Sequence, residues 1–131
     1  MELAISRALL NQIRLAAAES PDAEICGLLF GTAGVATGVL PCANVASNTS
    51  DSFEIDPRAL IAAHRDARSG GPALIGHYHS HPHGRADPSP RDIAAAQPGS
   101  YWIIAGGHDI ACWFAAPNGC FVPVAMLDPR D

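Results

Sequence analysis

The sequence predicts a single α/β domain, covering residues 1–131, in which helices flank a mixed β-sheet. Short apolar stretches bounded by Gly, Pro and Asn alternate with longer amphipathic stretches, which is the pattern of strands and helices packed in layers. The composition agrees, because 48% of the 131 residues are hydrophobic and 16% are charged. Such a chain buries a substantial core and is not disordered. We find no repeat, low-complexity segment or linker that would divide it.

The first forty residues predict a helix and two strands. The helix begins near Ser6 and buries one apolar face, formed by Leu9, Leu10, Ile13 and Ala17. Polar residues interrupt this apolar segment, so it is too short and too polar for a membrane span. Glu19-Ser20-Pro21-Asp22 ends the helix. A strand from Glu24 to Phe30 then turns through glycines and returns over Val35 to Leu40.

The middle of the chain predicts a loop and a second helix. The segment from Asn44 to Ser52 is polar and rich in turn residues, and we expect Phe53-Glu54-Ile55 to form a short strand after it. Asp56-Pro57 supplies an N-cap and a proline at the first helical position. This helix stops at Ser69-Gly70-Gly71-Pro72. Its inward face is formed by Leu60, Ala63, His64 and Ala67, with His64 partly buried.

The last third predicts four strands and one short helix. A strand from Ala73 to His81 ends at Pro82, because proline cannot donate to a β-ladder. The sequence Ser89-Pro90-Arg91-Asp92 forms a capping box that starts a helix over Ile93 to Ala96. Three strands follow, separated by turns at Gly106 to Asp109 and at Asn118-Gly119; they cover Tyr101 to Ala105, Ile110 to Ala115 and Cys120 to Val124.

Four of the six histidines lie between positions 77 and 83, which is the composition of a metal site. Side chains two apart on a strand share a face and stand about 6.6 Å apart, so His79 and His81 can bind one ion together. Imidazole suits Zn, Cu, Fe and Ni, and a set of histidines and a carboxylate suits a catalytic zinc. Alternation alone does not choose the pair, because His77, His79, His81 and His83 all fall on one face.

Four further residues have both a structural and a functional interpretation. Ser89 and Asp92 taken alone are helix caps, but a helix start beside the histidines makes Asp92 a candidate third ligand. Glu24 taken alone is a charged residue at an exposed strand end, but near a zinc ion it is well placed as a general base. Cys26 shares a face with Glu24, and a small buried residue is the better interpretation for it.

At this point the chain resembles a known family. The pattern His79-x-His81, seven residues, Ser89-x-x-Asp92, with Glu24-x-Cys26-Gly27 upstream, is similar to the JAMM motif of the JAB/MPN metallopeptidases, and most closely to their short bacterial members. The resemblance implies a JAB/MPN-like fold for the domain. It also implies that His79, His81 and Asp92 bind Zn²⁺, that Glu24 is the acid/base, and that Ser89 donates a hydrogen bond to the transition state. His77 and His83 then lie outside the ligand set.

The same resemblance implies a function. We expect a zinc peptidase or isopeptidase that hydrolyses the amide bond after the C-terminal Gly-Gly of a ubiquitin-like or sulfur-carrier protein. The alternative is a non-catalytic MPN-type scaffold that binds proteins, although such members usually lose motif residues. A zinc deaminase needs H-x-E and P-C-x-x-C, which are both missing here. The net negative charge of the chain disfavours a DNA-repair role.

Charge and cysteine content restrict the partners further. The net charge of −5 makes binding along a nucleic-acid backbone unexpected, and no segment predicts membrane association. The four cysteines form no C-x-x-C pair and follow no secretory signal, so we expect reduced thiols, mostly in the core, and a cytoplasmic location. The expected partner is therefore a protein or peptide conjugate as substrate. The oligomeric state is not predicted.

Overall fold

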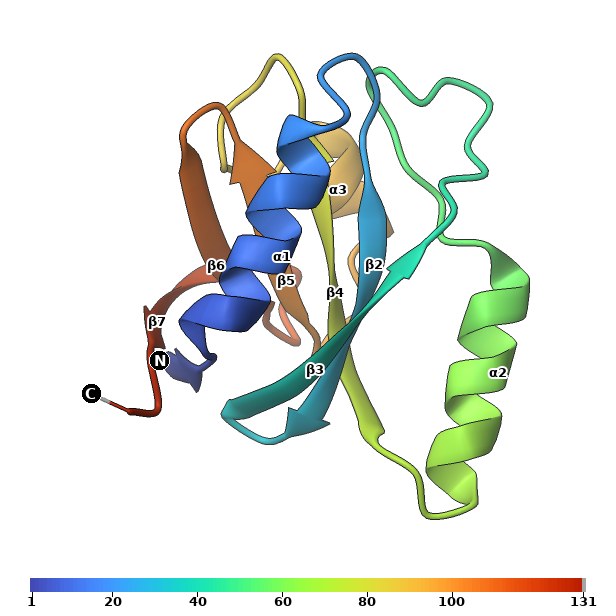
Figure 1. Ribbon diagram of the computed structural model, residues 1–131, viewed down its shortest axis with the longest axis vertical. Helices are drawn as coiled ribbons and strands as arrows, with labels where there is room; N and C mark the ends of the chain where they lie inside the picture. The colour runs from blue at the N-terminus through green and yellow to red at the C-terminus, as the bar shows by residue number, and fades with distance from the viewer. Residues whose placement is uncertain (131) are drawn as a thin grey trace.

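The protein is described here by a computed structural model of residues 1–130; Asp131, the last residue of the predicted domain, lies outside the described residues. Three helices and seven strands make up the described chain (Figure 1). In chain order they are β1 (Glu2–Ala4), α1 (Arg7–Ala18), β2 (Cys26–Thr32), β3 (Val35–Cys42), α2 (Pro57–Arg68), β4 (Ala73–His81), α3 (Pro90–Ala95), β5 (Tyr101–Gly106), β6 (Asp109–Ala115) and β7 (Phe121–Leu127).

The strands form one mixed sheet that closes into a barrel in the order β1-β3-β2-β4-β5-β6-β7. Most neighbours are antiparallel, but the central pair of β4 and β5 is parallel, with His79 opposite Ile104. The barrel closes through β1, which is parallel to β7 over three residue pairs and meets β3 only at Ala4 and Val35. The mixed sheet was predicted from the sequence. Closure was not, because a three-residue strand carries no periodic signal.

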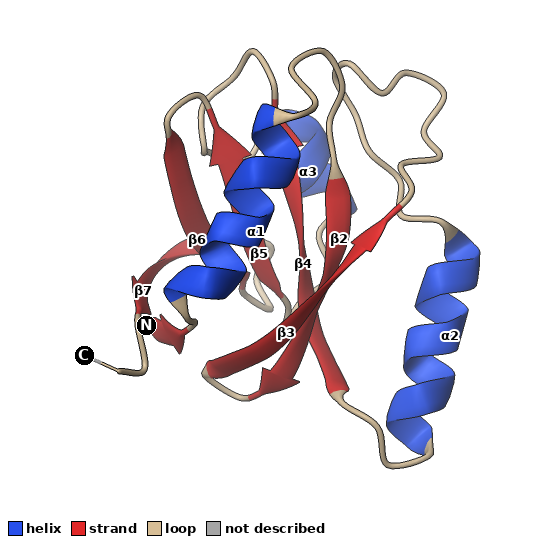
Figure 2. Cartoon of the chain, in the orientation of Figure 1, coloured by secondary structure: helices blue, strands red, loops and turns tan. Residues whose placement is uncertain are grey.

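Two helices cover different parts of the sheet (Figure 2). Helix α1 crosses the strands and inserts Ile13 into the larger hydrophobic cluster, beside Leu29 and Tyr78. Helix α2 packs beside β4 and places Ala63 in a smaller cluster with Cys26 and Leu28. Strand alternation explains why there are two separate clusters, since successive side chains of β2 point to opposite faces of the sheet. No helix within residues 1–130 is long and apolar enough to cross a membrane.

The Tyr78 ring lies directly over Gly27 in the β2–β4 pair. In the register of this pair Gly27 lies opposite Tyr78, and the Tyr78 ring occupies the space that a Cβ atom on residue 27 would need. Tyr78 is buried in the larger cluster. Glycine at position 27 therefore leaves room for the buried Tyr78 ring beside the histidine-bearing strand.

Two local predictions are wrong. Phe53-Glu54-Ile55 forms no strand, because only Ile55 makes an isolated bridge, with Asn44. His64 is exposed, although helical spacing placed it on the inward face of α2. Only Ala63 of that helix is fully buried, so the helix covers the sheet along a narrower stripe than its apolar residues suggested.

Candidate metal centre

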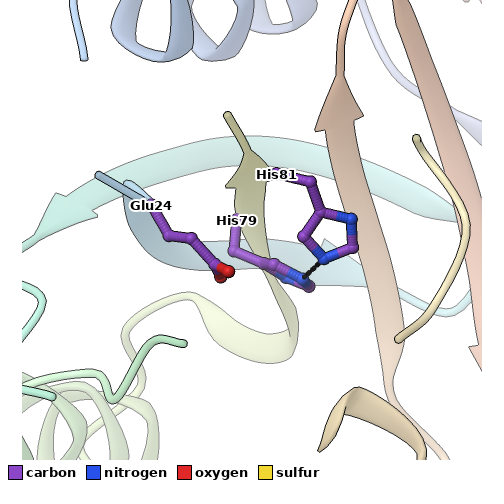
Figure 3. Close-up of side chains that lie close together, drawn as sticks. All are labelled: Glu24, His79 and His81. Carbon is purple, nitrogen blue, oxygen red and sulfur yellow. Dashed lines mark hydrogen bonds between the residues drawn. The ribbon is translucent and has the colours of Figure 1, made fainter. Parts of the chain in front are cut away.

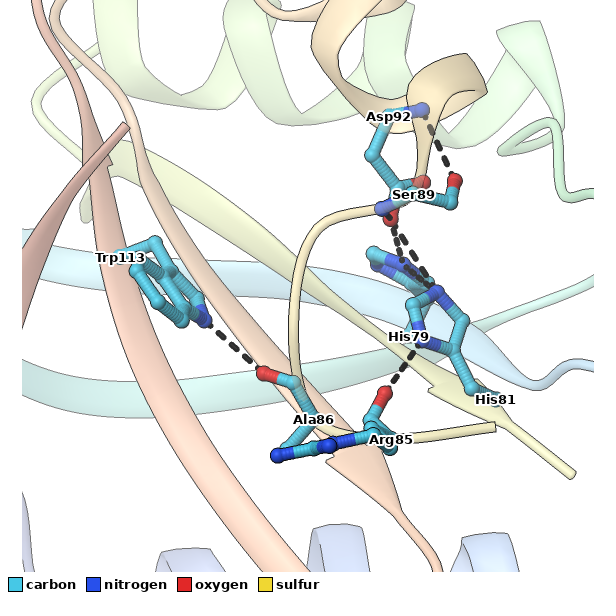
Figure 4. Close-up of polar contacts among 7 residues, drawn as sticks. All are labelled: His79, His81, Arg85, Ala86, Ser89, Asp92 and Trp113. Atoms are coloured by element: carbon cyan, nitrogen blue, oxygen red, sulfur yellow. Dashed lines mark hydrogen bonds and ion pairs between the residues drawn. The ribbon is translucent and has the colours of Figure 1, made fainter. Parts of the chain in front are cut away.

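The two histidines at the end of β4 point toward one another. The Nε2 atoms of His79 and His81 lie 3.1 Å apart, and each lies 3.1 Å from the same oxygen, Oδ2 of Asp92. Figure 4 shows these contacts between the strand and the start of α3. His79 and Asp92 are both buried. Three potential ligand atoms from two elements therefore converge on one point.

The start of α3 fixes the carboxylate of Asp92. Ser89 is the N-cap, and its backbone N–H donates to Asp92 Oδ2 at 2.9 Å while its Oγ accepts from the Asp92 N–H at 3.1 Å. This reciprocal capping box was predicted from the sequence. Burial acts to raise the pKa of the Asp92 carboxyl, but hydrogen bonds with His79 and His81 outweigh it and hold that pKa well below its ordinary value. Asp92 is therefore an anion at neutral pH.

The loop between β4 and α3 orients the second histidine. The Nδ1 atom of His81 lies 2.7 Å from the carbonyl oxygen of Arg85, which can only accept, so Nδ1 carries a proton. When the ring is neutral, Nε2 is therefore the atom whose lone pair can bind a metal. The indole N–H of Trp113 donates to the next carbonyl, that of Ala86, at 2.9 Å. The side chains of Arg85 and Asp87 are exposed and pair with each other, with 3.3 Å between Nε and Oδ2. Only the backbone of Arg85 contacts the site.

Glu24 lies two residues before the first residue of β2 and faces the histidine pair (Figure 3). One carboxylate oxygen and one ring nitrogen from each of His79 and His81 all lie within 4.8 Å of one another. Burial raises the pKa of Glu24 from its ordinary value of 4.5 to about 7. The structural interpretation of an exposed strand end is wrong, because this residue is only 6% exposed. Its backbone N–H donates to the Thr49 carbonyl at 2.7 Å, which fixes its position.

Asp92 and Glu24 are therefore placed differently relative to the histidines. The Asp92 oxygen is 3.1 Å from both ring nitrogens, whereas the Glu24 oxygen is placed only within 4.8 Å of them. A tetrahedral zinc with bonds of about 2.0 to 2.1 Å holds neighbouring ligand atoms about 3.3 Å apart. The trio of His79, His81 and Asp92 matches that spacing to within a few tenths of an ångström. Two imidazoles and a carboxylate are also a donor set that zinc takes, with a fourth position open.

His77 does not join the trio. It shares a strand face with His79, but the two ring centroids are 6.3 Å apart and the His77 ring packs at 4.1 Å against Trp102. Burial lowers the pKa of His77 to about 3, so the ring is neutral at physiological pH. His83 is exposed in the loop that follows β4. Among the histidines of this segment, the structure brings His79 and His81 together with Asp92.

Aromatic side chains line the inner side of the site. The Phe53 ring stacks on His79 with 4.3 Å between ring centroids and 19° between planes. Trp102 meets the edge of His79 at 5.6 Å. Sequence reasoning missed the place of Phe53 beside a ligand, because Phe53 was assigned to a strand. An adjoining cavity of about 560 Å³ is lined by parts of α2, β4 and the loop carrying Phe53, and it reaches Asp92.

Cys26 lies opposite His79 in the β2–β4 pair, but its thiol contacts backbone carbonyls. It is buried, and its Sγ lies 3.6 Å from the carbonyl oxygen of Ala43. Burial raises the pKa of this thiol to about 12. The four cysteines are free thiols, two of them fully buried, and Cys120 is exposed. The geometry supports a small core residue at position 26.

The family model described as prokaryotic homologs of the JAB domain matches residues 6–116. The chain belongs to this prokaryotic JAB family. A desampylase from Haloferax volcanii is 35% identical over 99 residues, which cover 73% of this chain and 71% of that protein. A probable TtuB-protein conjugate cleaving protease from Thermus thermophilus is 34% identical over 125 residues, which cover 95% of this chain and 83% of that protein.

The fold of this prokaryotic JAB protein is shared with solved structures. A JAB1/MPN domain protein from Archaeoglobus fulgidus matches with a TM-score of 0.62 at 21% identity, covering 98% of this chain and 100% of that one. The predicted fold class, a JAB/MPN-like mixed sheet flanked by helices, is therefore confirmed. The family resemblance inferred from the motif is confirmed as well.

Proposed function

We propose that this protein is a zinc-dependent peptidase or isopeptidase that hydrolyses the amide bond after the C-terminal Gly-Gly of a ubiquitin-like or sulfur-carrier protein. The observation that carries the proposal is the convergence of His79, His81 and Asp92 at 3.1 Å, with the Glu24 carboxylate beside them. The names of the two relatives, a desampylase and a conjugate-cleaving protease, support cleavage of a protein conjugate. The Gly-Gly tail comes from the JAMM resemblance.

In this proposal His79, His81 and Asp92 hold the metal. When bound there, zinc would supply a Lewis acid that lowers the pKa of water from 15.7 to about 7 and leaves one position open. The anionic Asp92 partly neutralises the ion. His81 offers Nε2 in the correct tautomer because the Arg85 carbonyl holds the other nitrogen's proton. His79 is buried, and burial lowers its pKa, which keeps the ring neutral and able to ligate.

Glu24 acts as the proton carrier. A general base works best when its pKa lies near the operating pH, and burial places the pKa of Glu24 at about 7 in the metal-free protein. The carboxylate takes a proton from the attacking water. The same group then gives it to the nitrogen of the leaving amine, which departs poorly as an anion. Both transfers occur on the side of the site that Glu24 faces.

Ser89 stabilises charge on the substrate carbonyl. Its Oγ accepts a hydrogen bond from the Asp92 N–H, so the hydroxyl hydrogen remains available as a donor. Donation to the oxygen that becomes negative in the transition state is worth about 3 kcal/mol in comparable sites. The scaffold alternative requires none of these arrangements. The complete set of five residues in one place therefore favours catalysis.

The proposal is tested by hydrolysis of a linear fusion in which a bacterial ubiquitin-like sulfur carrier ending in Gly-Gly is joined to a short peptide. We expect cleavage directly after Gly-Gly, mapped by mass spectrometry, in the presence of zinc. Cleavage should be lost with a chelator and restored by added zinc. Full activity in the chelated protein would contradict zinc dependence. Absence of cleavage in a protein that binds one zinc ion would contradict the substrate class but not the metal site.

A further inference from the structure

The candidate ligand His79 lacks the usual support for a metal-binding histidine. Such a ring normally donates its second N–H to a carbonyl, carboxylate or water, which fixes its orientation. His81 follows this rule through Arg85. Within residues 1–130, however, the buried Nδ1 of His79 has no hydrogen-bond partner. No hydrogen bond at Nδ1 therefore fixes the His79 ring, whose Nε2 is the atom directed at Asp92.

The side chain in the right place is Phe53. Its ring lies nearly parallel to that of His79, with 4.3 Å between centroids and 19° between planes, while Trp102 closes the edge at an angle of 84°. With the Phe53 ring against one face and the Trp102 ring nearly perpendicular to it, the His79 ring has little freedom to rotate about χ2. The stack with Phe53 therefore orients the His79 ring, as the hydrogen bond to the Arg85 carbonyl orients the His81 ring.

The loop that carries Phe53 is itself tied to the general base. Asn44 donates from Nδ2 to the carbonyl oxygens of Glu24 at 2.9 Å and of Ser52 at 3.1 Å. Its Oδ1 accepts from the backbone N–H of Glu54 at 3.1 Å and of Ala46 at 3.0 Å. One amide thus connects the backbone of Glu24 to both residues that flank Phe53.

We propose that Phe53 and Asn44 form a positioning pair: Phe53 orients the His79 ring for metal binding, and Asn44 fixes both the Phe53 loop and the Glu24 backbone. This inference rests on the proposed zinc site. It adds two residues outside the five-residue motif, and neither of them contacts the reacting atoms. Phe53 should therefore affect metal affinity, and Asn44 should affect both metal affinity and turnover.

The test for Phe53 is zinc affinity, measured by competition with a chelator of known affinity. We expect Phe53→Leu to weaken zinc binding about tenfold or more, as loss of a supporting group around a metal ligand typically does. Phe53→Tyr keeps the ring and should restore affinity. Phe121→Leu is the matched control, because Phe121 contacts Trp102 at 5.1 Å and makes no ring contact with His79. Wild-type affinity in Phe53→Leu, or equal losses in both leucine variants, would overturn the proposal.

A second measurement needs no metal. In the zinc-free protein, the stacked Phe53 ring should shift the His79 ring-proton resonances upfield. Phe53→Leu should remove that shift, and Phe121→Leu should leave it. Unchanged resonances in Phe53→Leu would show that the stack does not exist in solution.

For Asn44 the matched control is Asn48, whose Oδ1 bonds only to the N–H and hydroxyl of exposed Ser50. Asn44→Ala should lower both zinc affinity and kcat, whereas Asn48→Ala should change neither. Equal effects of the two alanine variants would contradict a positioning role. Zinc binding by the wild type without cleavage of the fusion would count against the proposed reaction and leave the positioning pair intact. A wild type that binds no zinc would overturn both.

Discussion

Ser89 is a helix cap and, in the proposed mechanism, also a hydrogen-bond donor to the substrate, and measurement can separate these two roles. Its Oγ caps α3 by accepting from the Asp92 N–H, and its hydrogen is the proposed donor to the substrate. We expect Ser89→Ala to lower kcat by about 10²- to 10³-fold, the usual loss for one such donor. The same change should cost about 1 kcal/mol of stability through the lost cap.

The control for the cap is Ser6→Ala. Ser6 caps α1 by accepting from the Leu9 N–H at 3.2 Å, away from the site. Ser6→Ala should lower the free energy of unfolding in denaturant by a similar amount and leave kcat unchanged. A Ser89→Ala variant with wild-type kcat would exclude Ser89 as a transition-state donor.

The buried thiols should be unreactive in the folded protein. Burial raises the pKa of both Cys26 and Cys112 to about 12, so at pH 8 these groups are almost entirely protonated, and the thiolate is the nucleophile. Iodoacetamide at pH 8 should modify exposed Cys120 first and reach the other two only after unfolding, as read by peptide mass spectrometry. Rapid modification of native Cys26 would instead indicate an activated thiol beside Glu24.

Among the elements, α1 contributes one fully buried side chain to the core. Ile13 is the one fully buried residue of this helix and is 1% exposed, whereas Leu15 is 62% exposed. Ile13→Ala should therefore lower the free energy of unfolding by about 2 to 5 kcal/mol, measured in urea. Leu15→Ala should change it by less than about 0.5 kcal/mol. Equal losses would mean that α1 packs through a different face.

The elements that build the site were largely predictable from the sequence, but their contacts were not. The capping box of α3 and the end of β4 at His81 follow from local rules about Ser, Pro and Asp. The register that sets Cys26 opposite His79 depends on long-range pairing. For the same reason the stack of Phe53 on His79 joins a loop to a strand and leaves no local pattern. The role of Glu24 was ambiguous from the sequence because burial of a charged side chain depends on the whole fold.

At the scale of the whole molecule, the candidate site joins a strand of the barrel to a helix that follows it in the chain. His79 and His81 lie at the end of β4 and Asp92 lies in the first turn of α3, and the three meet at one point. A metal bound there would stabilise the folded state, because a ligand that binds only the native protein raises stability with its concentration. Zinc should thus hold the loop from Pro82 to Pro88 in place.

Removal of zinc should accordingly lower the melting temperature. With free zinc at about 100 times the dissociation constant, the expected stabilisation is about 2.7 kcal/mol. Differential scanning fluorimetry with zinc and with a chelator measures this difference. Asp92→Ala should melt at the same temperature in both conditions. If the wild type melted at the same temperature with zinc and with the chelator, that result would argue against a native metal site.

The mixed sheet was predicted correctly from the sequence. Its closure into a barrel could not be predicted, because the closing strand β1 has only three residues. Alternating apolar segments identify strands but do not give their neighbours. The family resemblance selected His79 and His81 where spacing alone left four histidines possible. The structure brings those two, and not His77 or His83, to Asp92.

The assignment of separate roles to the motif residues is tested most directly by measuring zinc content and turnover together in two variants. Glu24→Ala should retain one zinc per chain by metal analysis and lose hydrolysis of the Gly-Gly fusion, because the proposal makes Glu24 a proton carrier and not a ligand. Asp92→Ala should lose both zinc and hydrolysis, because the proposal makes Asp92 a ligand. Full turnover in Glu24→Ala, or zinc retained with wild-type affinity in Asp92→Ala, would contradict the account.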